Sequence, residues 1–550
     1  MGHPGIASVN EDLSAIRKLA ASAESENKLP NACLKAAAGA VQLCRNDADS
    51  ILAFLILPGQ QEFSSGPLLR HILMLVVAGL DQQISDHTLQ HLVAATILAS
   101  VYGDTPSPSA QQALRRLTSL FRKRKFALWL DTLVLRKALA QKKSLPLLKR
   151  ASLNRYQRLV LLSDTLAQLI TQEPLSGVLR KLTLALPSLH HKELHSLQRL
   201  LGEYTPGARV LSQGVPAVIL AVRGNHAAVV NTAEKTGESA EHEWVTLQSL
   251  GTSARSPLLF DSWLGFYKQC QPDQDANTSA GPFRREYPIN RPPGSLLNII
   301  DALQASDIDI DKLCELIEKE PVFTDFLRQS ASSDNRLQLP VHNIKQAVLT
   351  YGTERVGDML TQQALQSRLN QHHFPLGTTL RHFAVLVSSI AAQLSTFTDT
   401  RFTSQSASLV STFLTAPLFM LPVMKTLSTL PLNPQSYHNL QQMVRVKGTE
   451  NWQTLVSDLA QGWHQSATWR ALLYHTGKLP SDVPRSLQKE YSLLCVAVFW
   501  AASWLFDTND ALSPLPMKIE QAMTILSLEP GLIESIRSET ASLLYCPLDL

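Results

Sequence analysis

Histidine, cysteine and carboxylate side chains are the groups of this 550-residue sequence that could bind a metal ion or act as nucleophiles. Three histidines of the C-terminal half, His382, His464 and His475, lack a carboxylate–histidine partner set at any spacing typical of a metal site. We therefore interpret each of them as a hydrogen-bonded or exposed side chain. The sequence contains no G-x-S-x-G, P-loop or G-x-G-x-x-G motif. The residue types alone thus predict no catalytic residue, no metal and no cofactor.

The cysteines are scattered, without a C-x-x-C pair or a regular spacing, which argues against a disulfide framework or a zinc knuckle. They are Cys33, Cys44, Cys270, Cys314, Cys495 and Cys546. We expect reduced, buried thiols. The N-terminal residues MGHPGIASVNEDLSAIRK carry acids and lack the apolar run of a secretory signal, so we expect a cytoplasmic protein.

Residues 115–158 form a basic segment, which contains 14 Lys and Arg residues and a single acid, Asp131. The segment therefore has a net charge of +13; because the whole chain carries +4, the remainder carries −9. Its densest part is Arg122, Lys123, Arg124 and Lys125. These four residues are candidates for binding a nucleotide, a nucleic acid, an acidic partner or the acidic surface of the same chain. A solvated helix face is an equally good interpretation.

The spacing of apolar residues predicts that most of these side chains lie on helices. In residues 1–200, Leu, Ile and Val recur three and four positions apart, as in LLRHILMLVVAGL and RYQRLVLLSDTLAQLI, which predicts a helical domain. From Tyr204, short β-branched runs separated by SQG and RGN predict hairpins, so residues 201–250 form a small β unit. Residues 251–292 are rich in Ser, Pro, Asp and Gly, which is typical of a linker.

The helical pattern returns in residues 293–550. An Asp in DIDIDKLCELIEKEP can cap a helix, Pro321 suits the first turn of the next one, and HNIKQAVLTYG stops at Gly352. Residues 404–424 and 491–506 are apolar, but the first is broken by prolines and the second is too short to cross a bilayer. The fold class predicted is mainly α, with two helical domains and a small β unit between them.

The C-terminal half resembles the HDOD domain family. Glu320–Pro321 stands at the family's D-P step, Gln329–Ser330–Ala331 at its N-S-A, and Tyr351–Gly352 at its L-G. The similarity covers most of residues 293–510. It implies an HD-related helical domain, in which Thr415–Ala416 stand where an active HD protein has His-Asp and His382 is a remaining histidine.

The N-terminal half resembles the HD-GYP phosphodiesterases. The most specific stretch is LGEYTPGARVLSQGVPAVIL, which is similar to the family's L-G-x-Y-P-x-G segment, although its proline comes one place late. The resemblance places His71 at the family's first histidine and Asp164 at its last metal-binding aspartate. It places Ala99–Ser100 at the His-Asp pair, and residues 105–150 contain no histidine for the H-H-E segment.

This resemblance implies a lost metal site. In HD enzymes, two His and two Asp hold a divalent metal that acidifies a bound water. Alanine has no lone pair and a neutral serine hydroxyl is a poor substitute for a carboxylate. His71 and Asp164 alone are isolated remnants and too few to retain a metal.

We therefore expect a non-catalytic, bacterial-type signalling protein that binds a nucleotide or a signalling partner through degenerate HD-type domains. One alternative is a metal-dependent phosphodiesterase of cyclic dinucleotides. Another is a nucleic-acid-binding regulator that uses the basic segment 115–158.

Overall fold

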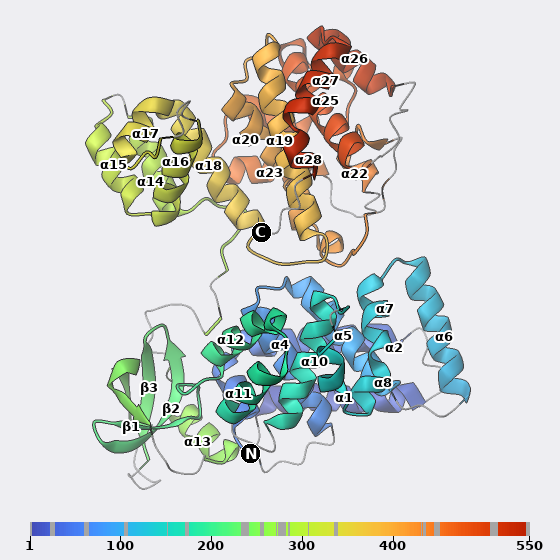
Figure 1. The fold of residues 1–550 in the computed structure, drawn as a ribbon, viewed down its shortest axis with the longest axis vertical. Helices are drawn as coiled ribbons and strands as arrows, with labels where there is room; N and C mark the ends of the chain where they lie inside the picture. The colour runs from blue at the N-terminus through green and yellow to red at the C-terminus, as the bar shows by residue number, and fades with distance from the viewer. Residues whose placement is uncertain are drawn as a thin grey trace. The chain divides into compact units, whose positions relative to one another are not determined.

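The computed structural model describes residues 3–21, 28–59, 65–103, 108–150, 152–170, 175–232, 241–252, 258–270, 272, 282–283, 286–305, 307–334, 339–430, 432, 436–444, 452–506 and 515–545. Its fold is mainly helical with one small antiparallel sheet, as the sequence predicts (Figure 1). The chain folds into two compact units. The first is Met1–Glu286 with His372–Phe374 and Thr426–Ser428, and the second is Tyr287–Gln371, Pro375–Lys425 and Thr429–Leu550.

The helices of the first unit pack around one apolar core. They are α1 (Pro4–Ala21), α2 (Leu29–Asn46), α3 (Ala48–Ile56), α4 (Gly66–Asp81), α5 (Asp86–Val101), α6 (Pro108–Lys123), α7 (Ala127–Val134), α8 (Arg136–Ala140), α9 (Ser144–Leu148), α10 (Arg155–Leu169), α11 (Leu175–Ala185), α12 (His191–Leu200) and α13 (Phe260–Cys270). Local signals set their ends. Asn154 and Gln157 form a reciprocal capping box at the start of α10, and Ser85 caps α5 by accepting a hydrogen bond from the Thr88 N–H.

The sheet has five antiparallel strands in the order β4-β3-β2-β1-β5. The strands are β1 (Arg209–Ser212), β2 (Val215–Arg223), β3 (His226–Asn231), β4 (His242–Thr246) and β5 (Leu250–Thr252). Both predicted hairpin turns are present. Gln213 and Gly214 join β1 to β2 with φ of 51° and 80°, and Gly224 begins the β2–β3 turn with φ of 59°. Such left-handed two-residue loops match the twist of the strands they join.

The sheet is part of the first unit. One set of strand side chains, including Val218 and Leu220 of β2, belongs to the helical core, whereas Ile219 and Val210 pack in a second cluster on the sheet's other face. A bidentate ion pair between Arg223 and buried Asp49 links β2 to α3. Because both faces of the sheet are apolar, the strands need the helices to cover one of them.

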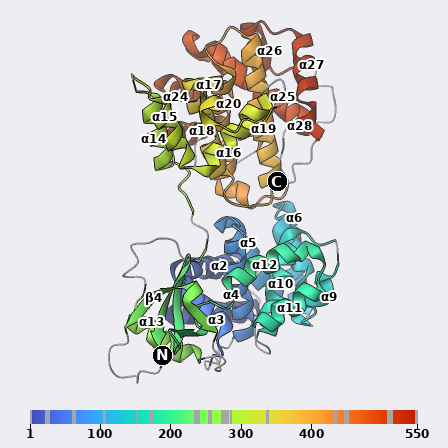
Figure 2. The same ribbon diagram turned by 60° about the vertical axis from the view of Figure 1, so that its left-hand side comes forward.

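Helix α13 lies within residues 251–292, which the composition predicts to be a linker. Its Trp263 is fully buried, donates its indole N–H to the Ile219 carbonyl over 2.9 Å, and stacks on Phe260 and Tyr267. Both views show α13 beside the sheet (Figures 1 and 2). The sequence prediction did not anticipate this helix, because its few apolar residues are diluted by the Ser-, Pro- and Asp-rich stretches around it.

The second unit is helical throughout its described part. Its helices are α14 (Gly294–Leu303), α15 (Ile310–Glu318), α16 (Pro321–Asp334), α17 (Ile344–Tyr351), α18 (Thr353–Leu369), α19 (Gly377–Phe397), α20 (Ser404–Thr415), α21 (Pro417–Met420), α22 (Leu440–Met443), α23 (Trp452–Gly462), α24 (Ala467–Tyr474), α25 (Gln488–Phe506), α26 (Met517–Leu526), α27 (Pro530–Glu539) and α28 (Ala541–Tyr545). Asp309 caps α15, Pro321 begins α16, and Gly352 ends α17 with φ of 77°, as predicted. In the described residues, no helix combines the length and the apolar character needed to cross a bilayer.

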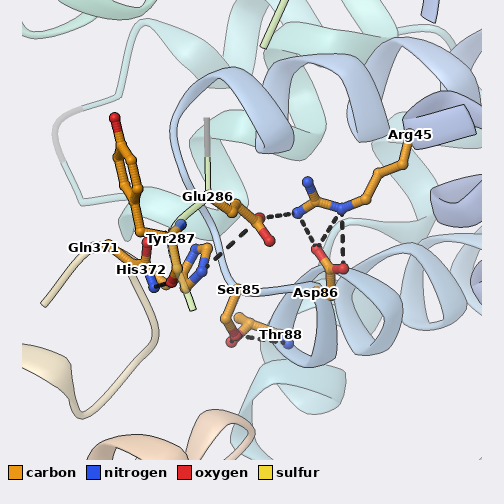
Figure 3. Close-up of polar contacts among 8 residues, drawn as sticks. All are labelled: Arg45, Ser85, Asp86, Thr88, Glu286, Tyr287, Gln371 and His372. Carbon is orange, nitrogen blue, oxygen red and sulfur yellow. Dashed lines mark hydrogen bonds and ion pairs between the residues drawn. The ribbon is translucent and has the colours of Figure 1, made fainter. Parts of the chain in front are cut away.

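The boundary between the two units lies between Glu286 and Tyr287. Polar contacts hold each of these two residues within its own unit (Figure 3). In the first unit, Arg45 makes a bidentate ion pair with Asp86 and a second ion pair with Glu286. In the second unit, Tyr287 and Gln371 exchange two hydrogen bonds between backbone and side-chain amide, of 3.0 and 2.8 Å. The last residue of one unit and the first of the next are thus each held locally.

Candidate functional site

His71 and Asp164, the two predicted remnants of a metal site, lie together in the first unit. They come from α4 and α10, which pack side by side (Figure 1). His71 is buried, and its Nδ1 lies 3.6 Å from Asp164 Oδ1, which is longer than a hydrogen bond. Its Nε2 is 3.1 Å from the Val160 carbonyl oxygen, to which it can donate. This ring nitrogen is therefore occupied by the backbone.

The Asp164 carboxylate is also occupied. Its Oδ2 accepts hydrogen bonds from Ser144 Oγ at 2.5 Å and from Gln168 Nε2 at 2.7 Å. Burial lowers the pKa of His71 from its ordinary value, and this effect outweighs the opposing ones of Asp164 and the Val160 carbonyl. The pair is thus part of a buried polar cluster in which one polar atom of each side chain is hydrogen-bonded within the fold.

The residues expected at the paired His-Asp position cannot complete a metal site. Ala99 is fully buried on α5, and Ser100 follows it in the last turn of that helix. Among the residues that the structure describes, no group of three or more His, Cys, Asp or Glu could hold a metal ion. The side chains at these positions do not fit a divalent metal, which needs more ligands than His71 and Asp164 provide.

In the second unit, Thr415 and Ala416 are both fully buried at the end of α20. The Thr415 hydroxyl donates to the Ser411 carbonyl of its own helix at 3.1 Å. His382 of α19 contacts the Leu543 carbonyl of α28 through Nε2. His475 follows α24 with its ring against Tyr474, and His464 is exposed after α23 with φ of 56°. These histidines have different neighbours and do not form a common site.

A cleft of about 530 Å³ opens beside Thr415, and sequence reasoning missed it. Its walls come from α18, α19, α20 and α21, and it is lined mostly by uncharged hydrogen-bonding side chains, among them Gln363, Gln366 and Thr412. Of the described residues that line it, Arg381 alone is charged. No spacing motif signals this set, because its members become neighbours only when the helices pack.

The basic residues Arg122, Lys123, Arg124 and Lys125 are all exposed at the end of α6 and in the turn before α7. Lys125 has φ of 56°, so the chain reverses at the end of this cluster. Among the described residues, the four side chains make no ion pair with a carboxylate. We call these four residues the basic turn. Its geometry allows contact with an anionic partner, and nothing in it identifies that partner.

Five of the six cysteines lie in the described residues and are free thiols: Cys33, Cys44, Cys270, Cys314 and Cys495. Burial raises the pKa of Cys33 to about 12 and raises the pKa of Cys495 as well. Thiols with raised pKa values are poor nucleophiles and metal ligands at neutral pH.

Comparison with known proteins identifies one part of the chain. Residues 289–403, which contain α14 to α19, match the HDOD domain family. No curated protein matches the sequence.

Three solved structures are similar to parts of the chain at low identity. An HDOD domain protein of unknown function from Geobacter sulfurreducens is 14% identical, covering 47% of this chain and 93% of its own, with a TM-score of 0.31. Two structures of the MmoQ response regulator from Methylococcus capsulatus are 15% and 16% identical, cover 44% and 46% of this chain and 93% and 96% of their own, and each have a TM-score of 0.24. These scores are too low to support a conclusion about fold. The family match assigns residues 289–403 to the HDOD domain family.

Proposed function

We propose that this chain is a non-catalytic regulatory protein, in which HD-type helical domains bind a ligand or a signalling partner. The HDOD domain at residues 289–403 supports a regulatory role. We also propose that residues 1–200 are a degenerate HD domain of the HD-GYP type. The contact between His71 and Asp164 across α4 and α10 supports this relationship, since the resemblance places both residues in one metal site.

The observation that carries the proposal is the small number of possible ligands near the two remnants. An HD phosphodiesterase needs two His and two Asp side chains for its metal. Here Ala99 and Ser100 stand where the resemblance places the paired His and Asp, and in the described residues no group of three or more His, Cys, Asp or Glu could hold a metal ion. A buried polar cluster such as that of His71 and Asp164 stabilises a helix pair without any metal.

Metal analysis and hydrolysis assays test the proposal against a cyclic dinucleotide phosphodiesterase. We expect purified protein to contain well below one Mn, Fe or Zn per chain and not to hydrolyse cyclic di-GMP. His71→Ala should lower the free energy of unfolding by about 2–4 kcal/mol, because it leaves a cavity beside a buried carboxylate. The exposed His195 supplies the matched control, His195→Ala, with little effect.

Stoichiometric metal together with turnover that His71→Ala abolishes would establish an enzyme instead. A chelator gives a second way to decide whether His71 is a metal ligand or a structural residue. If the wild-type protein loses stability in EDTA and the His71→Ala variant does not, the histidine holds a metal and the proposal is wrong.

The basic turn supports a second candidate function, the binding of a polyanion such as nucleic acid. Four adjacent exposed cations without a carboxylate partner in the described residues are the electrostatic feature that such binding requires.

A further inference from the structure

The cleft beside Thr415 has the size of a small-molecule site. Its volume of about 530 Å³ falls within the range of roughly 300–1,000 Å³ that is typical of ligand pockets. All of its lining residues belong to the second unit, and four consecutive helices contribute to it. Thr415 in its wall is the residue that the HDOD resemblance places at the lost His-Asp pair.

The positive charge of Arg381 in the cleft favours an anionic ligand. Arg381 is half-buried, and its Nε donates to Asn370 Oδ1 at 3.1 Å, which anchors the guanidinium to the cleft wall. A guanidinium has five N–H donors, so this bond leaves the two terminal nitrogens for other partners. Among the described residues that line the cleft, none has a carboxylate. Burial lowers the pKa of Arg381 from its ordinary value.

The other polar groups of the cleft are suited to the body of an organic molecule. Gln363 and Gln366 lie one helical turn apart on α18, and within the described residues their side-chain amides have no hydrogen-bond partner. Each amide offers both donors and an acceptor. The hydroxyls of Thr412 and Thr415 donate to carbonyls of their own helix, and the Thr412 oxygen also accepts from the Gln362 side-chain amide, so this part of the wall is already hydrogen-bonded.

We propose that this cleft binds a small organic anion, with its phosphate or carboxylate group on Arg381 and its polar body against Gln363 and Gln366. The proposal deepens the function proposed above and rests on it, since the unit that contains the HDOD domain would then recognise a molecule that it does not hydrolyse. A planar guanidinium binds either oxyanion through paired N–H donors, and such charge-assisted bonds are stronger than neutral ones.

Calorimetry and thermal shift of the full chain test the proposal with named probes. The probes are the four nucleoside 5′-monophosphates as organic phosphates, citrate as a carboxylate, and adenosine as the neutral counterpart of AMP. We expect at least one anionic probe to bind and to raise the melting temperature of the protein. If the site prefers phosphates, adenosine should bind at least about tenfold more weakly than AMP. Preference for citrate over all four nucleotides would assign the site to carboxylates.

Three variants locate the binding. Arg381→Gln should weaken the anion about tenfold or more, and Ala384→Trp should abolish binding by filling the cleft while leaving Arg381 in place. The matched control is Arg485→Gln, which removes the same charge from an exposed position of the same unit and should leave affinity unchanged.

Two results would overturn the inference: no binding of any anionic probe at millimolar concentration, or binding that Arg381→Gln and Ala384→Trp leave unchanged. Neither result bears on catalysis. Failure of the proposed function would show separately, as turnover of the bound probe or as stoichiometric metal.

Discussion

Asp164 illustrates how single residues decide what this protein can do. Its position on α10 is the one that the resemblance assigns to a metal ligand, but its Oδ2 accepts hydrogen bonds from Ser144 and Gln168. The ring of His71 lies beside it, with Nδ1 3.6 Å from Oδ1. At the scale of residues, Asp164 is thus part of a buried polar cluster that links α10 to α9 and α4.

His91 gives a prediction at the same scale. Trp129 donates its indole N–H to His91 Nδ1 at 3.0 Å, which requires a neutral acceptor nitrogen. Burial lowers the pKa of His91 to about 4, and repulsion from His87 adds to this effect. Between pH 6.5 and 4 the unfolded chain therefore binds a proton that the folded chain does not. The stability contributed by neutral His91 is complete above pH 6.5 and is lost as the pH falls toward 4.

Urea unfolding as a function of pH measures this contribution. We expect about 1–3 kcal/mol of stability to be lost over that interval through His91, allowing for its partial exposure. His91→Gln keeps an acceptor for Trp129 but does not titrate, so it should flatten the pH dependence. The exposed His195 gives the control His195→Gln, which should behave like the wild type. Equal slopes for all three proteins would show that His91 titrates normally.

At the scale of elements, α13 holds the sheet against the helices. Trp263 is its central contact, through the bond to the Ile219 carbonyl and the stacks on Phe260 and Tyr267. Trp263→Ala should lower the free energy of unfolding by about 3–5 kcal/mol, because it removes a fully buried indole and leaves the Ile219 carbonyl without its side-chain donor. Ser262→Ala, on the exposed side of the same helix, should change stability by less than about 0.5 kcal/mol. Thermal unfolding of both variants measures the difference, and similar melting temperatures would mean that α13 is not needed to hold the sheet.

The basic turn between α6 and α7 gives a second element-scale prediction. Replacing Arg122, Lys123, Arg124 and Lys125 with Ser should weaken binding to duplex DNA and reduce the slope of log affinity against log salt concentration by up to about 3–4, since each neutralised phosphate releases counterions. Because all four side chains are exposed, the melting temperature should hardly change.

A matched variant with Ser at Lys312, Lys319, Lys478 and Arg485 removes the same charge from exposed positions of the second unit. It should retain the salt slope of the wild type. Equal loss of binding in both variants would mean that net charge, and not the basic turn, governs binding. A large drop in stability in the first variant alone would indicate that the four side chains dock on acidic groups of the same chain.

For the whole molecule, each of the two units should survive separation. Each has its own buried core, and the residues between α13 and Tyr287 read QPDQDANTSAGPFRRE in the sequence, a composition that buries little. Limited trypsin digestion should therefore cut first at Arg284 or Arg285 and leave two stable fragments. Mass spectrometry should find the sheet and α13 on the N-terminal fragment. A first cut within residues 201–250 would contradict the packing of the sheet on the helices.

The sequence alone determined the features that depend on neighbouring residues. The cap at Asp309, the helix end at Gly352 and the turn at Gln213–Gly214 each follow from hydrogen bonds or backbone angles within a few residues. The mainly helical fold follows from apolar periodicity in the same way. The exposure of the basic turn was also expected, because four adjacent cations can be buried only at a large cost.

Tertiary structure alone decided the features that depend on residues distant in the chain. The sequence did not show that Ser144 would hold Asp164, that Trp263 would bind the Ile219 carbonyl from within a predicted linker, or that Arg381 would share a cleft with Gln363 and Thr415. Such contacts arise when helices pack, and packing is set by the shapes of whole faces and not by any local spacing. For this reason residue types alone could suggest that His71 and Asp164 belong together, whereas the cleft beside Thr415 could be found only in the folded chain.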